Sequence, residues 1–257
     1  MFVKMELVPG AEVAGVSPAL YLRKYKTLIM ADIHIGYEDE LASRGVFIPR
    51  FQLKRVIELL ERLFSSFPVS KLVIAGDLKH SFSGIGVAEK RELMKFFTYV
   101  APKVEEVIVV RGNHDNYLPL LKKKFDFMFE DYVVLGEYLV IHGHRPIPED
   151  VGSSWEYLIL GHEHPSITLR DSVGRLGKFS CFLVGEISSL NKVFVTLPAT
   201  GAYQTGSRIT LDKETYISPI LRENASIPNI KPVIVDEEIG VFELPQLKDI
   251  AEYLYTK

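Results

Sequence analysis

The fold is decided by residues 71–115, which read KLVIAGDLKHSFSGIGVAEKRELMKFFTYVAPKVEEVIVVRGNHD. Two short apolar runs, 72–75 and 107–110, are typical of buried strands. Between them, residues 87–100 carry apolar side chains at helical spacing, which predicts an amphipathic helix. A strand, a helix and a second strand at this spacing predict two parallel neighbours joined by a right-handed crossover.

The same alternation continues toward the N-terminus. Residues 26–31 read as another buried strand, and residues 51–64 repeat the helical spacing just after Pro49, a place that suits helix starts. The second half of the chain differs, because its apolar runs are short and closely connected, which favours an antiparallel or mixed sheet. These expected strands are 133–135, 138–141, 157–160, 179–184, 192–197, 233–235 and 241–244, followed by a short helix from about Gln246.

Together these elements predict a mixed α/β fold, in which two mixed β-sheets pack face to face with helices outside. No stretch of the sequence is a clear linker between two halves. We therefore expect a single domain over residues 1–257, whose C-terminal part, about 205–257, adds strands and the short helix.

The composition excludes several classes of protein. Of the 257 residues, 47% are hydrophobic and 25% charged, and the formal net charge is −3, which excludes intrinsic disorder. The single cysteine excludes a disulfide scaffold, and no apolar run is long enough for a membrane span. A strongly basic nucleic-acid binder is disfavoured. With no signal peptide we expect a cytoplasmic protein, and the scarcity of Asn and Gln favours a thermophilic source.

The seven histidines gather in one set of motifs. Six lie in five short blocks that follow predicted strands, and His80 lies three residues after one of them. The blocks are Asp32-Ile33-His34, Gly76-Asp77, Gly112-Asn113-His114-Asp115, His142-Gly143-His144 and Gly161-His162-Glu163-His164. Each block alone is also typical of an ordinary turn or polar network. Ligands bind at the carboxyl ends of strands in open α/β sheets, so the joint pattern predicts one functional site.

The residue types in these blocks indicate a metal site. Carboxylate, amide and imidazole donors without a thiolate suit manganese, iron, zinc or cobalt. Asp32 and His34 are one residue apart, so on an extended strand tip their side chains point the same way and can hold one ion. His162 and His164 have the same spacing, and the two oxygens of Asp77 could bridge two ions.

In this order, the five blocks resemble the calcineurin-like metallophosphoesterase superfamily. Residues 31–36, 76–80 and 197–199 resemble its ICC-like phosphoesterase group, some members of which are associated with DNA ligases. The resemblance implies a four-layer α/β/β/α sandwich that holds two divalent ions. It places Asp32, His34 and His164 on the first ion, Asn113, His142 and His162 on the second, and Asp77 on both.

The resemblance also implies the reaction. A metal-bound hydroxide would attack phosphorus in line with the leaving oxygen, and His114 would protonate that oxygen. Asp115 would orient His114 by accepting a hydrogen bond from its other ring nitrogen. The second block departs from a frequent family form, Gly-Asp-x-x-Asp, because His80 stands at the last position. His80 either contacts substrate or only binds a neighbouring residue.

Three further residues are candidates for substrate binding. His144 lies beside the expected ligand His142, and Arg111 and Arg145 flank two of the blocks, where a guanidinium could bind a phosphate oxygen. A surface ion pair is the equal alternative for each arginine. The Thr- and Gly-rich segment 200–207 could rim the pocket, although we favour an ordinary hairpin connection.

We therefore expect a dimetal-dependent phosphodiesterase or phosphatase acting on a nucleotide-like phosphoester. Manganese is the favoured metal, with iron, zinc, nickel or cobalt as alternatives. The second hypothesis is a nuclease acting on DNA or RNA ends, which would need a basic groove with stacking aromatic rings that the sequence does not reveal. DNA repair proteins are expected partners by resemblance alone, and no membrane is expected. A non-catalytic scaffold is disfavoured, because every ligand and the proton donor are present.

Overall fold

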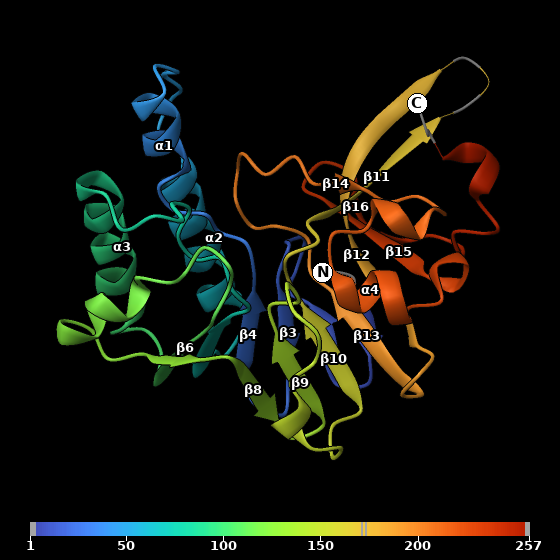
Figure 1. Ribbon diagram of the computed structural model, residues 1–257, viewed down its shortest axis with the longest axis horizontal. Helices are drawn as coiled ribbons and strands as arrows, with labels where there is room; N and C mark the ends of the chain where they lie inside the picture. Colours follow the sequence, from blue (N-terminus) through green and yellow to red (C-terminus); the bar gives the residue numbers. More distant parts are fainter. Residues whose placement is uncertain (1–3, 171, 173, 255–257) are drawn as a thin grey trace.

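The computed structural model describes residues 4–170, 172 and 174–254. It contains two β-sheets packed against each other, with helices on their outer faces (Figure 1). The predicted fold class, two mixed sheets flanked by helices, is confirmed. Among the described residues, no helix has the length and apolar character needed to cross a bilayer.

The first sheet has the spatial order β1-β2-β3-β4-β5-β6-β7. The strands from β4 to β7 are parallel, as the alternation of strands and helices predicts for β4, β5 and β6. Strand β7 was not predicted, and β1 to β3 add an antiparallel edge. Their bounds are β1 (Glu6–Val8), β2 (Ala11–Val13), β3 (Leu20–Leu22), β4 (Thr27–Met30), β5 (Lys71–Ile74), β6 (Glu106–Val110) and β7 (Met128–Glu130).

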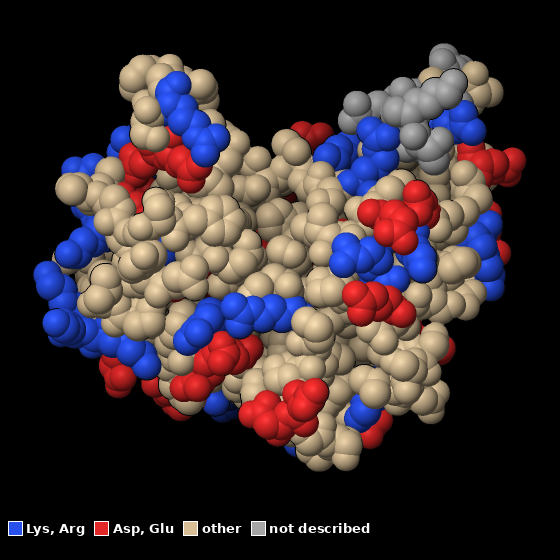
Figure 2. Space-filling view, viewed as in Figure 1, with Lys and Arg blue, Asp and Glu red and all other residues tan. Residues whose placement is uncertain are grey.

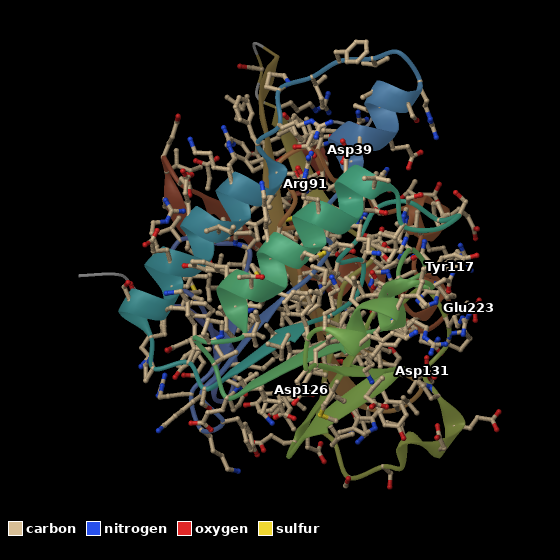
Figure 3. All side chains as sticks on the ribbon, turned by 90° about the vertical axis from the view of Figure 1, so that its left-hand side faces the viewer. Asp39, Arg91, Tyr117, Asp126, Asp131 and Glu223 are labelled. Carbon is tan, nitrogen blue, oxygen red and sulfur yellow. The ribbon has the colours of Figure 1, made fainter. Side chains whose placement is uncertain are left out.

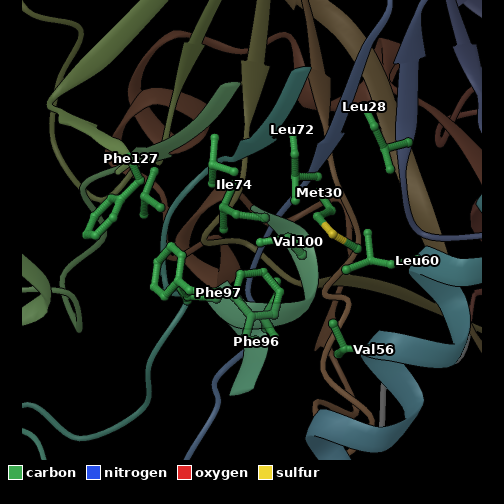
Figure 4. Packing of buried hydrophobic residues seen from close by; sticks show 14 of the residues in the cluster. Leu28, Met30, Val56, Leu60, Leu72, Ile74, Phe96, Phe97, Val100 and Phe127 are labelled. Carbon is green, nitrogen blue, oxygen red and sulfur yellow. The ribbon is translucent and has the colours of Figure 1, made fainter. Parts of the chain in front are cut away.

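Helices α2 (Gln52–Ser66) and α3 (Val87–Val100) cover the outer face of this sheet, where they lie side by side (Figure 3). Successive strand residues point to opposite faces, so alternate apolar residues of the parallel strands pack against these helices. Leu28 and Met30 of β4 belong to the hydrophobic core between the sheet and these helices. Phe96 of α3 belongs to the same core from the helix side (Figure 4). The intervening residues, such as Ile29, point toward the second sheet.

The second sheet runs β14-β11-β12-β13-β10-β9-β8, with β15 paired to β12 and β16 to β15. It is mixed, because β10 is parallel to β9 and β13 whereas β12 is antiparallel to its neighbours. The strands are β8 (Tyr132–Leu135), β9 (Tyr138–Ile141), β10 (Tyr157–Leu160), β11 (Pro165–Arg170), β12 (Arg175–Ile187), β13 (Lys192–Thr196), β14 (Ser207–Arg208), β15 (Lys231–Asp236) and β16 (Gly240–Glu243).

Apolar side chains of the two sheets meet in a shared core, and the outer face of the second sheet is covered by the C-terminal segments. These segments include the short helix α4 (Pro219–Asn224), whose Ile220 and Leu221 are buried there. The remaining helices are α1 (Tyr37–Ser43) and the 3-10 helices Leu118–Lys123, Glu149–Val151, Lys213–Thr215, Ile227–Asn229 and Ala251–Tyr253.

The predicted helix from about Gln246 is wrong. The backbone N–H groups of Leu247 and Lys248 donate to the carbonyls of Ile230 and Pro228, 2.9 and 3.0 Å away, rather than along a helix. The fully buried Leu247 side chain anchors this turn on the second sheet, and only the single 3-10 turn Ala251–Tyr253 follows.

Candidate metal centre

The five polar blocks meet where strands of both sheets end. Asp32, Asp77 and Asn113 follow β4, β5 and β6 of the first sheet, while His142 and His162 follow β9 and β10 of the second. The first two blocks are joined by their backbones, since Asp32 N–H donates to the Gly76 carbonyl at 3.0 Å and His34 N–H to the Asp77 carbonyl at 2.9 Å. The two sheets therefore bring all the expected ligands to one place.

The backbone at the site is in an unusual conformation. Of the non-glycine residues that the structure describes, seven have positive φ, and five of these are expected ligands. They are Asp32 (56°), His34 (52°), Asp77 (53°), His162 (67°) and His164 (46°). The left-handed region is costly for residues with a Cβ, and such strain concentrates at functional sites. The expected extended strand tips are thus replaced by left-handed turns.

Two glycines allow the blocks to approach each other. A Cβ at Gly112 would clash with the carboxylate and backbone nitrogen of Asp77, and a Cβ at Gly76 would clash with the ring of His142. Any side chain at these positions would push a candidate ligand out of place.

The side chains form two adjoining groups of metal-ligand type. Asp32, His34 and His164 make the first group, in which His164 Nε2 lies 3.0 Å from Asp32 Oδ1 and 3.5 Å from His34 Nε2. Asp77, His142 and His162 make the second. His162 and His164 therefore belong to different groups, although their spacing alone is compatible with one shared ion.

Asp77 lies between the two groups. Its Oδ2 is 3.4 Å from His142 Nε2 and 3.8 Å from His34 Nε2. Asn113 joins the second group, with Oδ1 3.1 Å from His142 Nε2. The seven residues assigned to metal by resemblance thus converge as two sets, with Asp77 between them.

The donor set fits divalent cations. Asp32 and Asp77 are buried carboxylates, and a buried negative charge requires compensation. His142 Nδ1 lies 2.9 Å from the Ala75 carbonyl, an arrangement that places the Nδ1 proton there and directs Nε2 into the site. Burial disfavours the charged ring, but the Asp77 and Asp32 carboxylates outweigh it and raise the pKa of His142 to about 9, so a bound cation would have to displace the Nε2 proton. Burial lowers the pKa of His34 to about 3 and that of His162 to about 4, so both rings are neutral donors near pH 7.

His80 and His114 form a third group with His34. His80 Nδ1 is 3.3 Å from His34 Nδ1, and its Nε2 is 3.2 Å from Glu40 Oε2, so this ring does contact neighbouring side chains. His114 Nδ1 meets the His80 carbonyl oxygen, which leaves Nε2 directed toward Asp77 Oδ2, 3.7 Å away.

Asp115 is placed differently from the expectation. Its carboxylate accepts backbone N–H groups of Asp77 (2.8 Å), Gly112 (3.0 Å) and Lys79 (3.2 Å), and the His80 carbonyl instead meets the ring of His114. Asp115 therefore joins the turns of the second and third blocks. Burial and the nearby Asp77 charge raise its pKa to about 7.

Residues 25–171 match the model of the calcineurin-like phosphoesterase family. The chain belongs to this family. It is therefore a hydrolase acting on phosphoesters, and the match covers more than half of its length. No curated protein matches the chain.

A solved structure shares the fold of this phosphoesterase. The crystal structure of nuclease MPE from Pseudomonas putida has a TM-score of 0.65 and 22% sequence identity, covering 95% of this chain and 100% of the nuclease. Yfce, a phosphoesterase from E. coli, is more distant, with a TM-score of 0.37 and 18% identity over 82% of this chain and 88% of Yfce.

A pocket whose lining includes two arginines, Arg111 and Arg145, and two aspartates, Asp131 and Asp150, adjoins the second ligand group of the phosphoesterase. Its volume is about 380 Å³, and Arg111, His142, His144 and Arg145 contribute to its lining. Arg111 also lies 3.4 Å from a carboxylate oxygen of Asp131, so it takes part in an ion pair as well as in the pocket. His144 Nδ1 is buried and has no hydrogen-bond partner among the described residues.

The segment 200–207 rims the site, so the hairpin connection that we favour from the sequence is wrong. Its Gly201 N–H donates to the Asp32 carbonyl at 3.0 Å, and Ser207 N–H donates to the His164 carbonyl at 2.7 Å. The segment therefore joins the first and fifth blocks. In Figure 2 the upper part of this face is hollowed between the lobe of α1 and that of β11 and β12, and neither charge sign dominates the hollow.

Several residues near the site are absent from the sequence-based expectations. Gln52 is buried and bonds both the Ile33 carbonyl and the Ala202 N–H group, so it connects the first block to the rim. The rings of Tyr37 and Phe82 lie beside His80 and His114, and Tyr203 stacks on Tyr37. Phe82 lies two residues after His80, the one sequence signal that could have indicated it.

Proposed function

We propose that the chain is a dimetal-dependent phosphodiesterase that hydrolyses a nucleotide-like phosphoester, with manganese as the favoured metal. The observation that carries the proposal is the meeting of two groups of buried Asp and His donors at Asp77, next to an arginine-lined pocket. Two divalent ions in such a site neutralise charge on the phosphoryl oxygens and activate water.

In this proposal the two ligand groups have distinct members. The first ion would be held by Asp32, His34 and His164. The second would be held by Asn113, His142 and His162. Asp77, which lies between the groups, would be available to both ions.

His114 acts as the proton donor to the leaving oxygen. The His80 carbonyl only accepts hydrogen bonds, so it fixes a proton on His114 Nδ1. Nε2, which faces the ligand groups, is therefore the ring nitrogen from which a proton would be transferred. Asp115 acts through the backbone, because it fixes the turns that carry Asp77 and Gly112.

Arg111 and Arg145 bind the phosphate-bearing part of the substrate. Both line the pocket beside His142, and a guanidinium matches the geometry of phosphate oxygens. His144 lines the same pocket with an unpartnered ring nitrogen, which can bond a further oxygen of the substrate.

The second candidate function is a nuclease that acts on DNA or RNA ends. The aromatic rings beside the site favour it, because nucleic-acid bases stack on such rings. The nuclease of P. putida supports this candidate only through its fold.

A turnover panel with manganese-loaded protein tests the proposal. It compares phosphomonoesters, bis(p-nitrophenyl) phosphate, 2′,3′- and 3′,5′-cyclic nucleotides, dinucleotides, and single-stranded and duplex DNA and RNA. We expect nucleotide diesters to be hydrolysed faster than monoesters. Faster hydrolysis of monoesters, or turnover of none of these by fully loaded protein, would contradict the proposal, and preference for long strands would favour the nuclease.

A further inference from the structure

Five rings form a continuous strip along one side of the ligand groups, in the order Phe82, His114, His80, Tyr37 and Tyr203. Phe82 lies against His114 with ring centroids 3.6 Å apart, and His114 stacks with His80 at 5.3 Å. Tyr37 meets His80 edge-on at 4.9 Å and stacks on Tyr203 at 5.6 Å. We call these five residues the ring strip.

Phe82 is the open end of the ring strip. Although its ring packs on His114, 55% of the residue is exposed. Because one face is against the imidazole, the exposed surface belongs to the other face and the edge. Phe82 contributes to the lining of a pocket of about 520 Å³. An aromatic ring with one supported face and one open face is suited to stacking on another flat ring.

The charges around this pocket differ from those of the arginine-lined pocket. Asp39, Glu40 and Glu89 contribute three carboxyl groups, against one guanidinium from Arg44. Such a lining disfavours phosphate and accepts an uncharged ring that carries N–H donors. Of the parts of a nucleotide, only the base has these properties.

The position of His114 decides which part of the substrate lies here. Its Nε2 faces the ligand groups and its ring lies against Phe82, so an oxygen that takes the proton from Nε2 lies beside the ring strip. The arginine-lined pocket adjoins His142 of the second ligand group. The site therefore has a side that offers two guanidinium groups to phosphate and an aromatic side for the leaving group.

Building on the proposed function, we propose that the ring strip, with Phe82 as its open face, stacks on the base of the nucleoside that leaves from the scissile phosphate. Stacking on an aromatic ring tolerates every base, because each has a flat π-face. The subsite therefore selects for the presence of a base rather than for its identity.

The experiment compares three dinucleotides with manganese-loaded protein: TpT, and the two analogues in which one or the other nucleoside carries no base. The fragment that retains the phosphate identifies the leaving side. We expect loss of the leaving-side base to lower kcat/KM by about 10-fold, mainly through KM, and loss of the other base to have a smaller effect.

Phe82→Leu and a matched variant, Phe242→Leu, then test the residue. Phe242 is similarly exposed, at 48%, but lies on β16. We expect Phe82→Leu to lower kcat/KM for TpT by about 10-fold while it cleaves the leaving-side abasic analogue at the wild-type rate. Phe242→Leu should behave as the wild type on all three substrates.

Three outcomes would overturn the inference. If the wild-type protein cleaved all three dinucleotides with equal kcat/KM, the base subsite would be refuted, whereas the proposed function would stand. A uniform loss in Phe82→Leu on all three, carried by kcat, would show that Phe82 only supports His114. Hydrolysis of bis(p-nitrophenyl) phosphate without cleavage of any dinucleotide would refute both the nucleotide function and the subsite.

Discussion

Replacement of Glu163 by alanine should lower the stability of the protein and weaken manganese binding. Glu163 lies between the expected ligands His162 and His164, and its carboxylate is buried. It accepts the Ser218 N–H at 2.9 Å and the Ile217 N–H at 3.1 Å, which fasten the segment before α4 to the ligand turn. This contact holds the C-terminal layer of the second sheet against the site.

The structure sets the size of the effect. Glu163→Ala leaves two backbone N–H groups without their acceptor. The Ser218 donor is buried, and an unsatisfied buried donor costs about 1–3 kcal/mol, whereas Ile217 is 45% exposed and its N–H can bond water. We therefore expect the free energy of unfolding to fall by about 1–3 kcal/mol. Because side chains that orient ligands tune metal affinity, we also expect manganese to bind about 10–100-fold more weakly. Glu163→Gln keeps an acceptor oxygen and should recover most of both losses.

Two measurements check this prediction. Urea unfolding in EDTA gives the stability of the metal-free protein, and a competition titration with a manganese chelator gives the affinity. The reasoning would be refuted if Glu163→Ala unfolded at the wild-type urea concentration and bound manganese as tightly as the wild type. It would also fail if Glu163→Gln were as damaged as Glu163→Ala, because the acceptor oxygen would then be irrelevant.

Three further predictions concern single residues. His114→Ala should keep its metal content but lose about 10²-fold or more in turnover of substrates with alkyl leaving groups. With p-nitrophenolate as leaving group the loss should be much smaller, and equal losses with both would contradict the proton-donor role. Gly112→Ala places a Cβ against Asp77 and should destabilise the protein by about 1–3 kcal/mol and weaken manganese binding, whereas Gly84→Ala, in open space, should do neither in the same assays. Burial raises the pKa of the Cys181 thiol, so the folded protein should resist a disulfide reagent until urea unfolds it, and rapid labelling in native buffer would be inconsistent with its position.

Much of the fold can be predicted from hydrophobic spacing. The predicted helix 87–100 agrees with α3, and the strand 157–160 agrees with β10, because both bury regularly spaced apolar residues. The edge strands β1 to β3 were not predicted, since each is only three residues long and is defined by pairing rather than by its own pattern. The turn at Leu247 was misread as helical because its backbone bonds go to a distant segment.

The candidate site is predictable to a similar degree. Its polar blocks meet because strand ends from both sheets converge, a consequence of topology that the order of elements already indicates. The partner of His114 could not be predicted, because the His80 carbonyl reaches it through a turn with left-handed residues. The contacts within the ring strip could not be predicted from the sequence either, because Tyr37, Phe82 and Tyr203 come from segments far apart in the chain.

The most direct test of the two-metal proposal is an anomalous diffraction measurement on crystals of the protein grown with manganese. We expect two anomalous peaks per chain, one among Asp32, His34 and His164 and one among Asn113, His142 and His162. Asp77 should contact both. A single peak, or a peak among His34, His80 and His114 in place of either, would contradict the proposal.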